Sequence, residues 1–244
     1  MADRIGLANL ADKRAVEAVP IAERWQVETA YQMLRETART HGARRAVSFQ
    51  IRSGAKDRAE TLTWADMHDR VTRAANLFRR LGVGPDDTVA YLLPNCNEAA
   101  IALLGGMTAG RVNPINPLLE VEQIAAILRE TGAKVLVTLV PFPKTDIAQK
   151  AHAAAAAAPE LAAVLEVDLN RYLGPPLAWA VPLMRPRLDA ARTARREDFH
   201  AALRRERGDA LTFEEPDGAD RIAALFHTGG TTGLPKIARH RQRG

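Results

Sequence analysis

The sequence has 244 residues, of which 47% are hydrophobic and 26% are charged, a balance that is ordinary for a globular protein with a substantial core. Its single cysteine, Cys96, excludes an internal disulfide framework, and no apolar run reaches the ~20 residues that span a bilayer. The net charge of +5 comes from basic residues interleaved with acidic ones, which indicates a solvated surface and argues against a nucleic-acid site.

The N-terminal part, residues 1–60, is expected to contain helices and one strand. Charged residues at positions 3, 4 and 12–14 interrupt it, so it lacks the apolar stretch of a signal peptide and we expect a cytoplasmic protein. No two of the six histidines have helical ligand spacing with a carboxylate between them, which disfavours a zinc site. Cys96 has no histidine partner at a recognisable spacing, so we expect a buried, unreactive thiol.

Residues 61–140 predict alternating helices and strands. Apolar residues recur at helical spacing from Met67 to Phe78, and this helix should stop at Gly82. The elements expected after it are a strand at Thr88–Leu93, a helix at 98–108 with Asn97 as N-cap, a strand at Arg111–Ile115, a helix at Val121–Glu130 and a strand at Lys134–Leu139. This order predicts three parallel strands side by side, joined by right-handed crossovers.

The next segment, residues 141–221, gives weaker signals. We expect a helix from about Thr145 to Pro159, a strand at Leu161–Val167 and a short helix from Asp198 to Arg205. The run from Tyr172 to Met184 is apolar but broken by prolines, which favours a surface loop and a short helix. Docking of this run on a membrane or an acyl chain stays open.

The most informative stretch follows the predicted strand Ile222–Phe226, whose place in the main sheet or in a separate one stays open. Three glycines and three threonines occupy residues 228–233, and Pro235 and Lys236 close the run. Glycines let successive backbone N–H groups converge on an anion, threonine hydroxyls add donors, and Lys236 adds a positive charge. The pattern therefore predicts a loop that binds a polyphosphate.

Other glycine loops fit this stretch less well. The Walker pattern needs adjacent glycine and lysine, whereas Leu234 and Pro235 intervene here. The dinucleotide-binding pattern needs three glycines that open a helix, and Pro235 disfavours that helix. A flexible turn remains the structural alternative, although the strand before the loop and Pro-Lys after it argue against that alternative.

The loop resembles the signature Thr-Ser-Gly-Thr-Thr-Gly-x-Pro-Lys-Gly of the acyl- and aryl-CoA synthetases, the adenylate-forming AMP-binding superfamily. The matching residues are Thr228, Gly230, Thr231, Thr232, Gly233, Pro235 and Lys236, while Gly229 replaces the serine and Ile237 the last glycine. Residues 61–139 resemble the same superfamily in the order and spacing of their strands and helices. The resemblance spans about residues 25–240.

The resemblance implies an α/β fold, the large N-terminal domain of an acyl-CoA synthetase built from parallel-sheet βαβ units and left incomplete. Its expected parts are 1–60, 61–140 with the βαβαβ unit, a variable segment at 141–221, and 222–244 with the strand and phosphate loop. Family members continue well beyond their loop, so we expect the segments that bind adenine and ribose, and the C-terminal domain, to be absent. The basic ending at 239–244, where the fold needs another packed strand, favours the same interpretation.

The resemblance also implies an ATP-dependent acid–CoA ligase of fatty acid metabolism. A carboxylic acid, with a fatty acid favoured and aromatic or small acids still open, would be activated as an acyl-adenylate and transferred to coenzyme A. Lys236 would be the catalytic residue, and Thr232 would bind Mg²⁺. The residues expected to bind ATP are Thr228, Gly229, Gly230, Thr231, Thr232, Gly233 and Lys236.

Two other functional classes compete with this one. The first is a non-catalytic α/β module that binds a nucleotide or phosphate, and an inactive fragment of a ligase would behave in the same way. The second is an oxidoreductase, which the missing third glycine and the lack of a suitably spaced acidic residue disfavour. We expect the 244-residue chain by itself to be inactive as a ligase, and peripheral membrane contact stays open.

Overall fold

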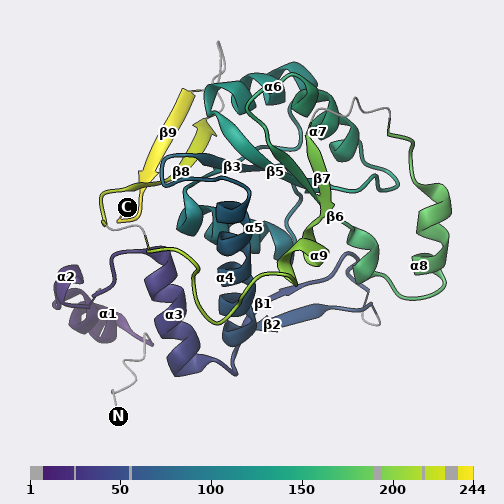
Figure 1. The fold of residues 1–244 in the computed structure, drawn as a ribbon. Helices are drawn as coiled ribbons and strands as arrows, with labels where there is room; N and C mark the ends of the chain where they lie inside the picture. The colour runs from purple at the N-terminus through teal and green to yellow at the C-terminus, as the bar shows by residue number, and fades with distance from the viewer. Residues whose placement is uncertain are drawn as a thin grey trace.

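The computed structural model describes residues 8–24, 26–54, 57–188, 194–215, 218–228 and 236–243. A seven-stranded sheet lies between two layers of helices, with a two-stranded sheet beside it (Figure 1). The strands are β1 (Arg45–Phe49), β2 (Glu60–Thr63), β3 (Thr88–Tyr91), β4 (Arg111–Pro114), β5 (Ala133–Leu139), β6 (Ala163–Val167), β7 (Arg195–Asp198), β8 (Ile222–Thr228) and β9 (Lys236–Arg241). The α-helices are α1 (Leu10–Glu17), α2 (Ile21–Arg24), α3 (Ala30–His41), α4 (Trp64–Arg80), α5 (Asn97–Ala109), α6 (Val121–Glu130), α7 (Ile147–Ala156), α8 (Leu177–Ala180) and α9 (Phe199–Leu203), and two 3₁₀ turns are η1 (Leu169–Tyr172) and η2 (Val181–Met184).

The large sheet has the strand order β7-β6-β5-β3-β4-β8-β9. Its neighbouring strands are parallel except for β8 and β9, which form an antiparallel hairpin. The predicted parallel strands β3, β4 and β5 are thus confirmed as neighbours, with β3 in the middle. The strand β8 joins this same sheet beside β4, so the alternative of a separate sheet is wrong.

The helices lie on both faces of the large sheet because the chain reverses direction at β3. It steps from β3 to β4 through α5, then returns past β3 to β5 through α6. Right-handed crossovers in opposite directions place their helices on opposite faces. The helices α4 and α5 pack together closely, since a Cβ added to Gly105 would lie only 2.7 Å from the Cβ of Ala74.

Helix boundaries follow local hydrogen bonding. The helix α4 starts with a capping box between Thr63 and Asp66 and ends before Gly82, whose positive φ of 91° glycine tolerates, as predicted. The prediction of Asn97 as the N-cap of α5 is wrong. Cys96 takes the N-cap position, because the buried amide of Asn97 donates instead to the backbone carbonyl and carboxylate of Glu60.

The segment after β5 agrees in outline with its predicted elements, since α7, β6 and α9 fall within the expected ranges. The basic C-terminal residues form the strand β9, contrary to the expectation that they would not supply a further strand. Arginine and lysine are compatible with β9 because it lies at the edge of the sheet and most of its side chains are exposed. Among the helices that the structure describes, none has the length and apolar character needed to cross a bilayer.

Candidate functional site

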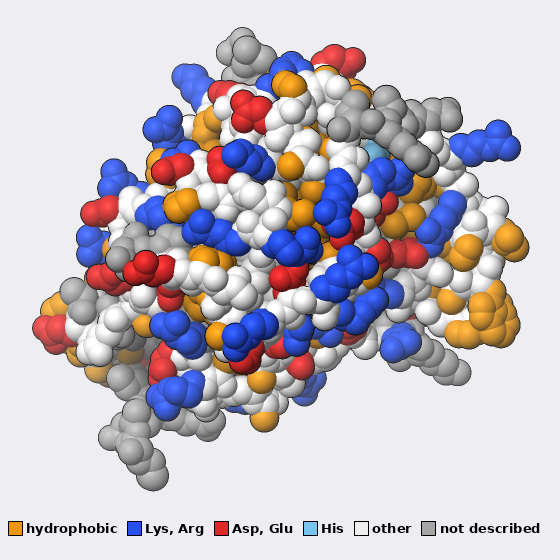
Figure 2. All heavy atoms as spheres, in the orientation of Figure 1, with side chains coloured by type: hydrophobic (Ala, Val, Ile, Leu, Met, Phe, Trp, Pro, Cys, Tyr) orange, Lys and Arg blue, Asp and Glu red, His pale blue; other side chains and the backbone are white. Residues whose placement is uncertain are grey.

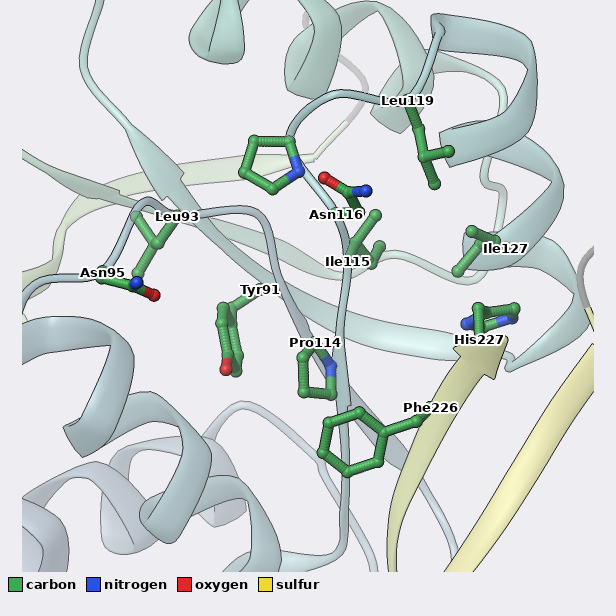
Figure 3. Close-up of a pocket in the computed structure, with 11 residues that line it drawn as sticks. Tyr91, Leu93, Asn95, Pro114, Ile115, Asn116, Leu119, Ile127, Phe226 and His227 are labelled. Atoms are coloured by element: carbon green, nitrogen blue, oxygen red, sulfur yellow. The ribbon is translucent and has the colours of Figure 1, made fainter. Parts of the chain in front are cut away.

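A cavity of about 350 Å³ opens at the carboxyl ends of β3, β4 and β8. Connections leave β3 and β4 toward opposite faces of the sheet, and such a switch in direction forms a crevice where ligands bind in open α/β sheets. Figure 3 shows Tyr91, Pro114, Phe226 and His227 around this cavity. Its volume lies in the usual range of small-molecule sites, so this edge of the sheet is the candidate functional site.

The predicted phosphate loop starts at the same edge. Thr228, the last residue of β8, lies opposite Lys236, the first residue of β9. The hairpin register therefore brings the lysine backbone beside the start of the glycine-threonine run, although eight positions separate them in the sequence. The other predicted binding residues, Gly229, Gly230, Thr231, Thr232 and Gly233, lie outside the described residues, as does the side chain of Thr228.

His227 connects the loop to the cavity. Its side chain is only 7% exposed, and burial lowers its pKa while Glu130 opposes this effect. The ring is therefore neutral at pH 7, and its Nδ1 accepts a hydrogen bond from the Asn113 amide nitrogen at 3.2 Å. The proton then resides on Nε2, which has no hydrogen-bond partner among the described residues and lies 3.9 Å from the Glu130 carboxylate.

Asn113 holds the β8–β9 hairpin to the rest of the sheet. The pairing of β4 with β8 is short, with Val112 opposite Ala224. The fully buried amide of Asn113 adds a cross-strand bond, because its nitrogen donates to the Leu225 carbonyl at 2.6 Å. Neither Asn113 nor His227 was predicted as a site residue. The sequence carried a weak signal for each residue: Asn113 is a polar residue in an apolar strand, and His227 directly precedes Thr228.

We expect Asn113→Leu to destabilise the chain by about 1–3 kcal/mol, because it leaves the buried Leu225 carbonyl and the His227 ring without their donor. Urea unfolding would measure the change in free energy. The exposed Asn95 makes no such bond in the described part of the chain, so Asn95→Ala is the matched control. Equal unfolding midpoints for Asn113→Leu and the control would contradict this role.

Comparison of the sequence with models of known protein families identifies the family of this chain. A model described as AMP-binding enzyme matches residues 34–244. The chain belongs to this AMP-binding enzyme family. The predicted resemblance to adenylate-forming enzymes is thus confirmed.

Several relatives of this AMP-binding chain are CoA ligases, and others are acetyl-coenzyme A synthetases and surfactin synthase subunits. The chain is 33% identical to a marinolic acid–CoA ligase of Pseudoalteromonas sp. (strain SANK 73390), over 97% of this chain and 33% of the relative. It is 28% identical to a long-chain-fatty-acid–CoA ligase of Bacillus subtilis (strain 168), over 86% of this chain and 36% of the relative. Among solved structures, the anthranilate CoA ligase AuaEII with anthranoyl-AMP has a TM-score of 0.64 at 18% identity, covering 88% of this chain and 35% of that one. The AMP-binding chain therefore spans about a third of the length of these CoA ligases, and the structural likeness supports the same α/β fold.

A second cluster of charged groups in this AMP-binding chain lies at the start of α5. The carboxylate of Glu98 is fully buried and accepts hydrogen bonds from Arg171, Tyr172 and His200 at 2.5, 2.7 and 2.8 Å. Arg171 also makes a two-point contact with Glu60, with both distances at 2.8 Å. The cluster ties β2, α5, η1 and the start of α9 together.

The protonation states of this cluster favour a structural role. Burial alone would raise the pKa of Glu98, but the hydrogen bonds from His200 and Tyr172 and the charge of His200 lower it to about 2. Burial and the negative charge of Glu98 raise the pKa of the neighbouring Cys96 thiol to about 12, so Cys96 stays protonated. The prediction of a buried thiol is confirmed. The Glu98 carboxylate has no exposed surface, which fits a role in stabilising the fold.

The chemistry of the loop residues fits a polyphosphate better than a metal ion alone. Backbone N–H groups, hydroxyls and an ammonium group all attract phosphate oxygens, whereas Mg²⁺ needs oxygen ligands such as the Thr232 hydroxyl. Within the described ranges, no group of three or more histidine, cysteine, aspartate or glutamate side chains could hold a metal ion.

Proposed function

We propose that this chain supplies the phosphate-binding part of an ATP-dependent acid–CoA ligase. The observation that carries the proposal is the β8–β9 hairpin, whose register sets Lys236 opposite Thr228 beside the cavity at the carboxyl edge of the sheet. Membership of the AMP-binding family and the CoA ligases among the relatives support the same reaction class.

The reaction proposed for the whole enzyme has two steps. A carboxylate oxygen attacks the α-phosphorus of ATP, and the bond from that phosphorus to the leaving pyrophosphate breaks, which gives an acyl-adenylate. The thiol sulfur of coenzyme A then attacks the acyl carbon and displaces AMP. Both steps exchange one bond for another without oxidation or reduction.

The loop residues would act on the leaving group by electrostatics. Negative charge moves onto the β- and γ-phosphates as pyrophosphate departs, and preorganised donors stabilise such charge. We assign the backbone of residues 228–233 and the Lys236 ammonium to this task, with the Thr232 hydroxyl as a ligand of Mg²⁺. When bound, Mg²⁺ would share in neutralising the phosphates. No side chain of this loop needs to act as a nucleophile.

A fatty acid is the proposed acid substrate. The support is a relative named for long-chain fatty acids, together with the mainly apolar lining of the cavity. The competing proposal is a non-catalytic module that binds a nucleotide or phosphate at the same loop. The ligase and the non-catalytic module differ in whether a carboxylic acid stimulates a reaction of ATP.

The test joins residues 1–240 to the remaining C-terminal part of the Pseudoalteromonas relative. We expect this chimera to exchange pyrophosphate with ATP when a long-chain fatty acid is added, and to release AMP when coenzyme A is also present. Nucleotide binding without acid-dependent exchange would favour the non-catalytic module.

We expect the 244-residue chain by itself to show no detectable acid-dependent ATP–pyrophosphate exchange. The chain matches 33% and 36% of the length of two CoA-ligase relatives, and we propose that the groups that bind adenine and ribose lie in their later segments. Radiolabelled pyrophosphate incorporation into ATP, with the chimera as the positive control, measures this. Robust exchange by the 244-residue chain would show that these 244 residues suffice for adenylation.

A further inference from the structure

Four exposed apolar side chains form a projecting group on the turns that follow β6. We call this group the apolar tip: Leu177, Trp179, Leu183 and Met184, with exposed fractions of 40%, 71%, 90% and 63%. Among the described residues, the other exposed large apolar side chains are Leu10, Val19, Ile21, Met33, Leu118 and Phe226. A cluster of this kind marks an interaction surface more often than a single exposed leucine does.

The apolar tip is held in place by contacts at its base. Val181 is buried between the exposed residues, and the Asn170 amide donates to the Ala178 carbonyl at 3.0 Å. Arg185 donates to the Asp168 carboxylate at 2.5 Å. These contacts fix the start and the end of the turns, so the apolar side chains are directed outward.

Positive charge surrounds the apolar tip. Arg185 and Arg187 follow it in the sequence, and a cavity of about 370 Å³ beside it is lined by Arg52 and Arg58 together with Leu177. Figure 2 shows orange side chains at the position of α8 with blue ones beside them. Asp57 and Asp168 lie in the same region and each pairs with an arginine, Arg52 and Arg185 respectively.

We propose that the apolar tip inserts into the interface of a bilayer that contains anionic phospholipid. Tryptophan prefers the boundary between headgroups and acyl chains, leucine and methionine gain from leaving water, and arginines bind lipid phosphates from the same side. The combination of apolar centre and basic border fits a lipid surface better than a second copy of this basic chain, whose like charges would meet across the contact. The proposal stands apart from the proposed function, since β5, β3 and β4 separate β6 from β8 in the sheet.

The first test is sedimentation of the chain with vesicles. We expect binding to vesicles of phosphatidylcholine with one third phosphatidylglycerol, and binding at least about tenfold weaker to phosphatidylcholine alone. The double variant Trp179→Ala, Leu183→Ala should lose about tenfold or more in affinity for the anionic vesicles. Ile21→Ala, which removes a 79% exposed side chain on a different helix, is the matched control and should bind like the unchanged chain.

A second test uses Trp179 as a reporter. In the variant Trp25→Phe, Trp64→Phe, its fluorescence should shift to shorter wavelength with anionic vesicles and be quenched by brominated acyl chains. Unchanged fluorescence, equal binding to neutral vesicles, or equal binding by the double variant would overturn the proposal. Self-association that the double variant abolishes, without vesicle binding, would assign the apolar tip to a second copy instead. Lys236→Ala should leave vesicle binding unchanged, which keeps this test separate from that of the phosphate loop.

Discussion

Lys236→Ala, made in the chimera with the C-terminal part of the Pseudoalteromonas relative, is expected to lower acid-dependent turnover about a hundredfold. In the proposed reaction, the substitution removes a preorganised positive charge from the departing pyrophosphate, and loss of one such contact typically costs ~3 kcal/mol of transition-state stabilisation. Steady-state release of AMP in the presence of a fatty acid and coenzyme A measures the effect.

Two further variants are needed to interpret the result for Lys236→Ala. Thr232→Ala should also lower turnover, and raised Mg²⁺ should restore part of the loss if its hydroxyl lies near the metal. Arg205→Ala is the control, because Arg205 is 65% exposed and pairs with Glu197 at 3.3 Å. If Lys236→Ala kept full turnover, the glycine-threonine run would be only a flexible connection between β8 and β9.

The largest expected effect on stability comes from Glu98→Ala. The fully buried carboxylate has three partners, and its loss leaves Arg171, Tyr172 and His200 without their shared acceptor. Breaking a buried ion pair from one side typically costs about 3–5 kcal/mol, and we expect the lower value because Glu60 still neutralises Arg171. Urea unfolding at pH 7 measures it. Glu36→Ala, which breaks an exposed pair with Arg39, should change little.

The contribution of Glu98 should also depend on pH. Its pKa is about 2 in the folded chain and about 4.5 as the ordinary value, so the folded state favours the ionised form. The stabilisation is therefore fully present above about pH 4.5 and is lost as the pH falls from there toward 2. The stability difference between the unchanged chain and Glu98→Gln should shrink over this window. A constant difference would mean that the charge of Glu98 does not stabilise the fold.

The parallel sheet could be predicted from the sequence because the patterns that mark its strands and helices are local. Strands such as β5 are mainly apolar, and the helices between them have clear periodicity and ends marked by residues such as Gly82. The edge strand β9 was missed because its exposed basic residues carry no apolar pattern. Asn97 was misplaced as a cap because a tertiary partner, Glu60, competes for its side chain.

Only part of the candidate site could be predicted from the sequence. The loop residues form a compact pattern, so residues 228–236 were identified directly, and their phosphate role remains a proposal. The cavity and Asn113 depend on strand order, which brings residue 113 beside residue 225. The Glu98 cluster likewise depends on contacts between residues 60, 98, 171 and 200, and no spacing along the chain reveals those contacts.

The most direct measurement is a crystal structure of the chimera with Mg²⁺ and a non-hydrolysable analogue of ATP. The account predicts that the β- and γ-phosphate oxygens lie within hydrogen-bond distance of the backbone N–H groups of residues 228–233 and of the Lys236 ammonium group. Phosphates bound elsewhere, with this loop making no contact to them, would contradict it.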